Sequence, residues 1–318
     1  MKVAYFGLPL GALALRRDGH QLGPIVLSPV DAPGRFRLRG EPALIDALAS
    51  DEDLERRVER ALDGAEVDLL VSWFWTRKLP GAWLARARWG GIGAHPSLLP
   101  RYRGPNPYFA AIDAGDEETG VTVHRLTADY DTGAMLAKRR LAVGVRDAWQ
   151  LARALDRPSL TLLRDVVARF ARGDRPTEEE QDDALASWAP EPTRDLLKVD
   201  FGWTTERLLR RIRALSPTPG VALSIEGVEL FVTRAEAVPS YVTALLPGEA
   251  HLSDALTLRT ADGAIRVTRA FFPSAQELDG PSGGQARERP DTPPVDGDGV
   301  EAANAGEVLR LLKRVSQP

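Results

Sequence analysis

The chain has 318 residues, 43% of them apolar, a length and composition that suit two folded domains. Its net charge of −4 is too small to indicate bulk nucleic-acid binding, and the absence of cysteine excludes disulfides, thiolate nucleophiles and cysteine-ligated metals. No charged leader opens the chain and no apolar run approaches the roughly 20 residues that span a bilayer, so we expect a cytoplasmic protein without a membrane partner.

The N-terminal half alternates strand-like and helix-like segments. Residues 3–6 are apolar and are followed by Gly7 and a helical pattern that ends near Gly19, which indicates the start of a parallel α/β unit. The glycines here do not form a G-x-G-x-x-G pattern, so we do not expect NAD binding. Further segments continue the alternation: a strand at 21–30, a helix at 41–64 and a strand at 67–75.

Two groups of side chains in this half allow two interpretations each. Arg35, Arg37 and Arg39 alternate in the loop after the second strand, where a solvated loop is the simpler interpretation and contact with a polyanion the other. The aromatic residues Trp73, Phe74 and Trp75 end the strand at 67–75, and they suit a core or a ligand-binding wall equally well.

The next segments continue to about residue 192. We expect a helix at 106–115, a strand at 119–126 and a strand at 136–143. Residues 147–173 have a helical pattern interrupted by Pro158, which predicts two helices or one kinked helix. Residues 174–195 are acidic and contain several prolines, which is typical of a linker.

The C-terminal part reads as a small β domain. A helix near 204–215 precedes several short strands, and Asp262-Gly263 marks a hairpin turn. Short strands with glycine turns suit a small open barrel of the OB-like type. Residues 274–318 are expected to form a flexible Pro/Gly-rich segment and a terminal helix near 305–315.

The candidate catalytic residue is His95, one of only four histidines. Because the residue before a proline is pushed out of the helical region, Pro96 predicts that His95 ends a strand and is rigidly aimed. Asp129 and Asp131 lie in the loop after the strand that contains His124, itself interpreted as a packed or surface histidine. Two carboxylates so close can bind a metal, but no cysteine or histidine cluster supports one, so we expect no metal site.

Three blocks resemble the folate-dependent formyltransferases, which include the methionyl-tRNA, sugar-nucleotide and glycinamide ribonucleotide enzymes. They are HPSLLPRYRG from His95, AGDEETGVTVHRL from Ala114 and YDTGAML from Tyr130, at matching spacings. The segment at 199–227 also resembles the linker and first helix of the second domain in the methionyl-tRNA enzymes. The resemblance implies a Rossmann-like parallel α/β domain at 1–173, a linker at 174–195 and an OB-like barrel at 196–273.

The resemblance also implies the chemistry. In the family an amine attacks the formyl carbon of 10-formyltetrahydrofolate, while a histidine stabilises the oxyanion and shuttles a proton. These roles fall on His95, with Asp131 favouring its protonated form. The folate contacts fall on three loops: Arg77, Lys78 and Leu79; Ser97, Leu98, Leu99 and Pro100; and Thr127, Ala128, Asp129 and Tyr130.

Gly93 departs from the family pattern. The family has an asparagine there, a side-chain donor to the oxyanion whose loss elsewhere lowers turnover by about 10²- to 10³-fold. Glycine leaves space for a substrate group or a water, or lets backbone N–H groups act as donors. A second departure is Pro105, Asn106 and Pro107, where sugar-modifying members often have another arginine.

The acceptor of the formyl group is the most open question. Residues 196–318 carry 14 Arg and Lys against 16 Asp and Glu, whereas a tRNA-binding barrel should be basic. We therefore expect a small or carrier-bound amine, such as an amino sugar, rather than tRNA. The alternatives are a methionyl-tRNA formyltransferase, a repurposed enzyme that hydrolyses formylfolate or acts on another carbonyl, and a non-catalytic binding protein. The sequence does not indicate an oligomeric state.

Overall fold

The computed structural model describes residues 1–47, 51–225, 228–239, 241–253, 255–271 and 301–302. It divides the chain into two compact units. The first contains residues 1–107, 118–142 and 153–190, and the second contains 108–117, 143–152 and the described residues from 191 onward. The expected domain boundaries stay a prediction, and the expected terminal helix and the segment at 274–299 lie outside the described residues.

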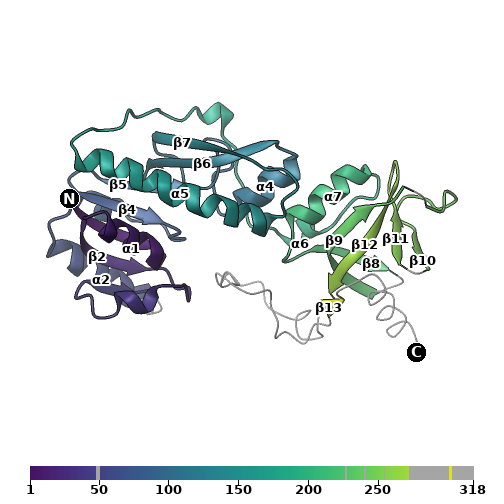
Figure 1. The fold of residues 1–318 in the computed structure, drawn as a ribbon, viewed down its shortest axis with the longest axis horizontal. Coiled ribbons are helices and arrows are strands. Elements are labelled where there is room, and N and C mark those ends of the chain that lie inside the picture. The colour runs from purple at the N-terminus through teal and green to yellow at the C-terminus, as the bar shows by residue number, and fades with distance from the viewer. Residues whose placement is uncertain (48–50, 226–227, 240, 254, 272–300, 303–318) are drawn as a thin grey trace. The chain divides into compact units, whose positions relative to one another are not determined.

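The first unit is a sheet covered by helices on both faces (Figure 1). Within the described residues its seven strands run in the order β3-β2-β1-β4-β5-β6-β7. Strands β1 to β5 are parallel, whereas β6 and β7 are antiparallel to their neighbours. The strands are β1 (Lys2–Gly7), β2 (Gln21–Leu27), β3 (Leu44–Asp46), β4 (Leu69–Trp73), β5 (Gly91–His95), β6 (Glu118–Arg125) and β7 (Met135–Ala142).

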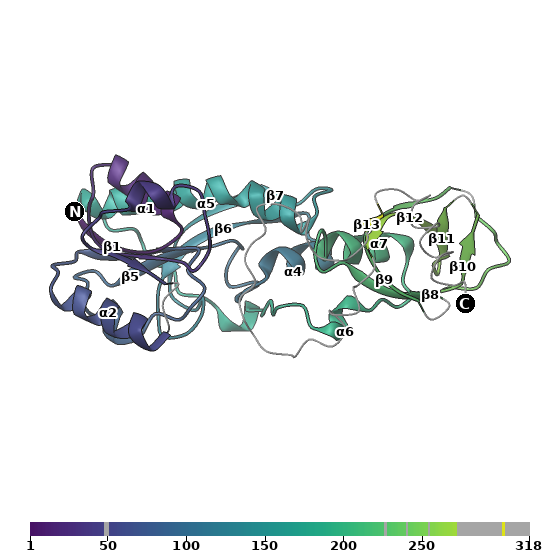
Figure 2. The same cartoon turned by 90° about the horizontal axis from the view of Figure 1, so that it is seen from below.

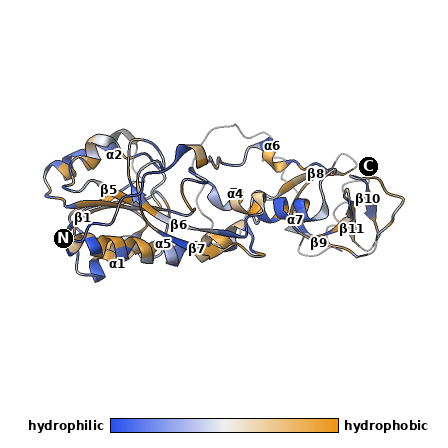
Figure 3. Cartoon of the chain, turned by 90° about the horizontal axis from the view of Figure 1, so that it is seen from above, coloured by the Kyte–Doolittle hydropathy of each residue, from blue (hydrophilic) through white to orange (hydrophobic). Residues whose placement is uncertain are grey.

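Alternating side chains of the central strands build two cores. Tyr5 and Val71 pack with helices α1 (Pro9–Arg17) and α5 (Ala148–Ala171) on one face of the sheet. Phe6 and Leu70 pack with α2 (Asp51–Asp63) and α3 (Gly81–Leu84) on the other face. Strands covered on both faces are apolar at almost every position, which explains the continuous apolar runs in the sequence. Figure 3 shows the apolar colour concentrated along these strands.

One local prediction was wrong. Residues 44–46, expected to be helical, form the edge strand β3 beside β2, and the described helix α2 covers Asp51–Asp63. Of the two alternatives for the region around Pro158, two helices or one kinked helix, the structure has a single helix, α5, with the proline inside it. Leu155 and Leu163, on either side of Pro158, are both buried, and this burial outweighs the backbone bond that proline removes.

The second unit contains a curved antiparallel sheet beside helix α7, and this part is drawn in the green to yellow range of the colours (Figure 2). Its strands run in the order β10-β11-β12-β9-β8, with β13 beside β12. The described elements are α4 (Pro107–Ala114, whose first residue belongs to the first unit), α6 (Arg194–Leu197), α7 (Thr205–Ala214), β8 (Val221–Ile225), β9 (Val228–Ala237), β10 (Ala250–Leu252), β11 (Leu256–Arg259), β12 (Ala264–Phe271) and β13 (Glu301–Ala302). The predicted hairpin at Asp262-Gly263 joins β11 and β12, and the predicted fold class is confirmed.

A partly buried ion cluster links helices α4 and α7 of the second unit. Asp113 on α4 accepts two hydrogen bonds from Arg207 and two from Arg211, both on α7, at 2.6–3.0 Å. The ring of Trp203 lies under both guanidinium groups, 4.3 Å from Arg207 and 5.1 Å from Arg211.

In the described part of the chain, no helix is both long and apolar enough to cross a membrane.

Candidate functional site

The candidate site lies where the parallel strands end. Strands β4 and β5 finish at Trp73 and His95, and ligands of open α/β sheets bind beyond these carboxyl ends. The prediction that His95 ends a strand is confirmed. Its side chain is 6% exposed, so the imidazole is almost completely enclosed by the protein.

Both ring nitrogens of His95 face protein groups. Nε2–H donates to the carbonyl oxygen of Tyr102 at 2.7 Å, and Nδ1 lies 3.4 Å from Oδ2 of Asp131. The turn that follows His95 is held by its own side chains. Ser97 donates to the carbonyl of Arg101, and Thr122 donates to the carbonyl of Ser97 and accepts from the amide of Leu99. The turn therefore presents His95 from a fixed frame.

Asp131 lies in the β6–β7 loop with a positive φ of 58°, a strained conformation for a residue other than glycine. Its Oδ2 accepts a hydrogen bond of 2.9 Å from the amide of Gly104. The Gln181 side chain donates to the carbonyl oxygens of Asp131 and Gly133, at 2.7 Å each. These bonds hold the carboxylate toward His95 despite the strain.

His124 belongs to the same cluster, which the sequence interpretation missed. It is 3% exposed, and its Nε2 lies 3.6 Å from Oδ1 of Asp131. Burial lowers the pKa of His124 and is the largest influence, the Asp131 carboxylate opposes the shift, and His95 adds to it. Strand alternation alone shows that His124, Thr122 and Leu126 share a face. Only the antiparallel pairing of β5 with β6 puts that face beside His95.

Gly93 is buried in β5 and pairs with His124 in β6. The space that a side chain at position 93 would need is already taken, because a Cβ there would lie 2.9 Å from Cδ2 of Leu126. The sequence interpretation expected this space to hold a substrate group, a water or closely approaching backbone. In the structure the side chain of Leu126 borders it.

The loops expected to contact folate meet beside this cluster. Lys78 Nζ lies 3.3 Å from Oδ1 of Asp129 and 5.2 Å from the ring centre of Tyr130. Tyr130 is 40% exposed, whereas Leu79 is buried in the core. Thr127 bonds to Asp129 and Thr132 within its loop. Ser97 and Leu99 are buried, so their side chains support the turn, while Leu98 and Pro100 are partly exposed.

The structure separates the members of the two ambiguous groups of side chains. Arg35 is structural, because it pairs with Asp46 and donates to the carbonyls of Ser28 and Val30, while Arg37 and Arg39 are exposed. Trp73 belongs to the core: it is 4% exposed and its indole N–H donates to Ser159. Phe74 and Trp75 are partly buried and pack against the two cores of the sheet.

Residues 178–189, which we call the strap, run along the site loops. Glu179 and Met135 exchange two backbone hydrogen bonds, and Arg103 exchanges two more with Ser187 and Ala189. The ring of Trp188 covers Gly104, where a Cβ would lie only 2.9 Å from it. Arg103 donates through two of its nitrogens to Oε1 of Gln181, the residue whose amide holds the Asp131 loop. The strap therefore links the loops that carry Tyr102 and Asp131.

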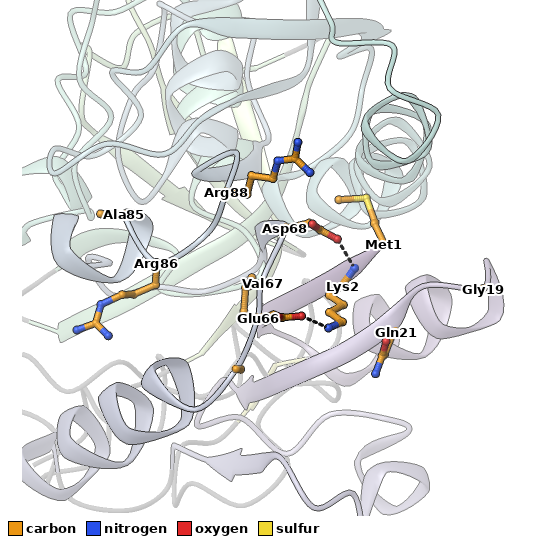
Figure 4. Close-up of a pocket in the computed structure, with 11 residues that line it drawn as sticks. Met1, Lys2, Gly19, Gln21, Glu66, Val67, Asp68, Ala85, Arg86 and Arg88 are labelled. Carbon is orange, nitrogen blue, oxygen red and sulfur yellow. Dashed lines mark hydrogen bonds and ion pairs between the residues drawn. The ribbon is translucent and has the colours of Figure 1, made fainter.

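A separate pocket of about 660 Å³ lies at the opposite, amino end of the strands (Figure 4). Its walls include Lys2, Glu66, Asp68 and Arg86. Lys2 pairs with Glu66, and its backbone N–H donates to Asp68. Arg86 pairs with Asp63, which is not part of the walls, and none of the candidate site residues lines this pocket.

Comparison with known proteins gives consistent results. Residues 32–157 match the family model described as formyl transferase, and residues 193–283 match the model of the formyl transferase C-terminal domain. A methionyl-tRNA formyltransferase of Janthinobacterium sp. is 33% identical over 303 residues, which are 87% of this chain and 95% of the relative. One from Acidiphilium cryptum is 32% identical over 284 residues, covering 84% of this chain and 91% of the relative.

Solved structures share the fold. An N-formyltransferase from Helicobacter canadensis in complex with folinic acid and dTDP-3-aminofucose aligns with a TM-score of 0.64 at 14% identity, over 84% of this chain and 98% of its own. HypX from Aquifex aeolicus in complex with tetrahydrofolic acid aligns with a TM-score of 0.62 at 22% identity, over 88% of this chain. The chain spans about half the length of HypX, 47%.

Proposed function

Because the chain belongs to the formyl transferase family, we propose that it transfers the formyl group of 10-formyltetrahydrofolate to the amine of a small or carrier-bound substrate. The observation that carries this proposal is the placement of His95 at the end of β5 with Asp131 at 3.4 Å, inside the region that matches the family model. A buried histidine oriented by a carboxylate is the arrangement that acid–base chemistry at a carbonyl needs.

The residues beside the cluster fit a folate. Lys78, Asp129 and Tyr130 provide charged groups and an exposed aromatic ring at the strand ends, suited to a flat polar heterocycle. Bound there, 10-formyltetrahydrofolate supplies an activated formyl group on its N10. The loops at Arg77–Leu79 and Thr127–Tyr130 are the proposed holders, with the turn from Ser97 to Pro100 as the support behind His95.

His95 acts through Nε2. Its N–H, now donated to the Tyr102 carbonyl, turns to the formyl oxygen, where negative charge develops as the amine attacks. The Tyr102 carbonyl gives up this bond when substrate enters. The acceptor amine loses one proton and the folate nitrogen gains one, so the site has to carry one proton from the amine to the folate, with no net uptake or release. Asp131 favours the ring form that carries it.

In the proposed mechanism, Gly93 is the position at which this site differs from the family pattern. With no amide side chain at position 93, the imidazole is the side-chain donor to the oxyanion. The Leu126 methyl group beside Gly93 makes that region apolar. We therefore expect slower formyl transfer than an asparagine-bearing site would give, or an acceptor shaped to lie against Leu126.

The charges of the C-terminal unit support a small or carrier-bound acceptor. The basic side chains of α7 already have partners: Arg207 and Arg211 bind Asp113, Arg210 binds Glu206, and Arg213 donates to the carbonyl of Gly144. Phosphate contacts by free Lys and Arg provide most of the affinity for tRNA, and these arginines are occupied.

The names of the relatives favour a second candidate, methionyl-tRNA. The similar sequences from Janthinobacterium and Acidiphilium are methionyl-tRNA formyltransferases and align over more than 90% of their own length. Arg37 and Arg39 remain exposed on the loop after β2, where an acceptor stem could be contacted. Substrate competition must therefore decide between the two candidates.

The experiment is a release assay for tetrahydrofolate. The protein is incubated with 10-formyltetrahydrofolate and, in parallel, with methionyl-tRNA, nucleotide-linked amino sugars, other small amines or no acceptor. We expect release that depends on a small amine and is lost in His95→Ala. Release without any acceptor would identify a hydrolase, and release with methionyl-tRNA alone would identify the second candidate. No folate binding by calorimetry would refute both.

A further inference from the structure

Asp131 faces two histidines rather than one. Its Oδ2 lies 3.4 Å from Nδ1 of His95 and its Oδ1 lies 3.6 Å from Nε2 of His124. The two rings are perpendicular, with an interplanar angle of 83° and centres 6.5 Å apart. We propose that His124 is a positioning residue that shares one proton with His95 across Asp131, so that the site works as a His95–Asp131–His124 relay. Its part in turnover rests on the proposed function.

The hydrogen bonds of the two histidine rings show which of their nitrogens carry a hydrogen. A neutral imidazole has one N–H, and only the cation has two. His95 Nε2 lies 2.7 Å from the Tyr102 carbonyl and His124 Nδ1 lies 2.8 Å from the Arg125 carbonyl, so each ring must place a hydrogen there. The two nitrogens that face Asp131 are therefore lone pairs whenever the rings are neutral. Two lone pairs against an ionised carboxylate repel it, and one added proton turns one of these contacts into an attraction.

A second added proton is opposed by burial and charge. It would create two cations around one carboxylate, with both rings at least 94% buried. The groups that act on His124 include Asp131, which favours its charged form, and His95 and Arg103, which disfavour it. Because such coupling is reciprocal, a proton on His124 also disfavours one on His95. The cluster therefore holds one proton most stably, on one ring or the other.

Because position 93 is a glycine, it places no polar side chain beside the His124 ring. Positions 93 and 124 are paired across β5 and β6, so the family asparagine would lie beside the His124 ring. With glycine there, His95, His124 and Thr122 are the polar side chains that β5 and β6 place near position 93 on this face, and Thr122 is used by the Ser97–Leu99 turn. His124 is then the group that adjusts the charge on Asp131 while His95 handles substrate.

The test is an NMR titration of the histidine rings, which needs no substrate. Sharing predicts that His95 and His124 each titrate in two steps, because each curve reports both protonations. His124→Gln places a neutral amide near Asp131 that takes up no proton, and in this variant His95 should titrate in one step. His251→Gln, which removes an exposed histidine of the C-terminal unit, should leave the two-step curve unchanged.

A single-step His95 curve that is the same in wild type and His124→Gln would overturn the relay, whether or not formyl transfer is found. His124→Asn, which retains a donor for the Arg125 carbonyl, serves if the glutamine variant does not fold. If neither variant folds, the test uses Asp131→Asn. The relay predicts that the midpoint of the His124 titration moves to lower pH in that variant, and an unmoved midpoint would overturn the relay. In turnover, we expect His124→Gln to lower kcat about tenfold, less than the roughly 10²-fold or greater loss of a direct acid–base residue, and to narrow the pH profile.

Discussion

The side chain of His95 is almost completely buried among the described residues. Its Nε2–H is held by Tyr102 and its Nδ1 faces Asp131, so the ring is oriented before substrate binds. His95→Ala should lower turnover by about 10²-fold or more whatever the acceptor, because it removes the side chain that we propose as both oxyanion donor and proton carrier. Asp131→Asn should leave a folded protein with reduced kcat, since Asp131 lies in a loop. Steady-state kinetics and circular dichroism check both. Near-wild-type turnover of the two variants would rule out the site.

Gly93 gives a second prediction at the residue level. An asparagine there collides with Leu126, so Gly93→Asn should lower native turnover and cost about 1–3 kcal/mol of folding free energy from overpacking. Leu126→Ala in the same chain removes the collision. The double variant should regain part of the stability without regaining native turnover if the site is adapted to an acceptor that lies against Leu126, as we propose. Chemical denaturation and formyl-transfer kinetics measure the two effects.

The double variant also has an informative opposite outcome. If Gly93 merely degrades an ordinary formyltransferase, the restored amide should raise formyl transfer above wild type, by up to about 10²-fold for a recovered oxyanion donor. Leu126→Ala alone is the matched control, because it opens the same space without the amide. A rise in the double variant but not in this control would contradict the adapted site.

The sequence identified the residues of this site unevenly, for physical reasons. Pro96 restricts the backbone of His95, so its position at a strand end was readable from local rules. Asp131 was found through the resemblance alone. His124 was interpreted only as a packed or surface histidine, because alternation shows which residues share a face but not which strand lies alongside. The register between β5 and β6 is long-range information.

Among the elements, the strap explains how a strained Asp131 loop stays in place. Gln181 donates to two carbonyls of that loop and accepts from Arg103, so its removal leaves three polar groups without these bonds. Gln181→Ala should cost about 1–3 kcal/mol of stability and lower kcat, because Asp131 would no longer be held toward His95. Denaturation and steady-state kinetics test this. Asp183→Ala is the control: Asp183 also contacts Arg103 but is 86% exposed, so its loss should change either quantity little.

The elements that the sequence mispredicted are those decided by their neighbours. Residues 44–46 follow a helical pattern, yet β2 offers an open edge, and pairing at Ile25, Val26 and Leu27 makes them a strand. Pro158 left two helices or one kinked helix open, and the single helix α5 is favoured because Leu155 and Leu163 are buried on both sides of the proline. Local propensity is a weak signal wherever tertiary burial opposes it.

The Asp113 cluster makes a prediction for the second unit. Asp113→Ala leaves Arg207 and Arg211 without their shared carboxylate, and the Arg211 side chain is only 8% exposed. An uncompensated buried charge of this kind costs about 3–5 kcal/mol, so the thermal unfolding of this variant should begin well below that of wild type. Asp195→Ala is the matched control, since its pair with Lys198 lies at the surface with both side chains over 70% exposed. Equal unfolding curves for the two variants would show that the cluster is not a main support of this unit.

On the scale of the whole molecule, charge rather than fold separates the two candidate acceptors. The chain has a net charge of −4, and residues 196–318 contain more acidic than basic residues. Within the described second unit, α7 carries its arginines on one helix but directs them to Asp113, Glu206 and backbone carbonyls. Such arginines stabilise the unit and leave little positive charge for a polyanion.

This distribution of charge predicts a weak dependence on salt. A protein that grips tRNA through six to ten phosphates loses about 10³- to 10⁵-fold in affinity between 50 and 200 mM salt. For a small amine we expect kcat/KM to change by less than about tenfold over the same range, because few counterions are released. The measurement compares the best acceptor of the release assay at several salt concentrations, with methionyl-tRNA measured alongside. A steep decline for the preferred acceptor, reduced in an Arg37→Ala, Arg39→Ala variant, would show instead that the exposed arginines after β2 hold a polyanion and that the acceptor is carried on RNA.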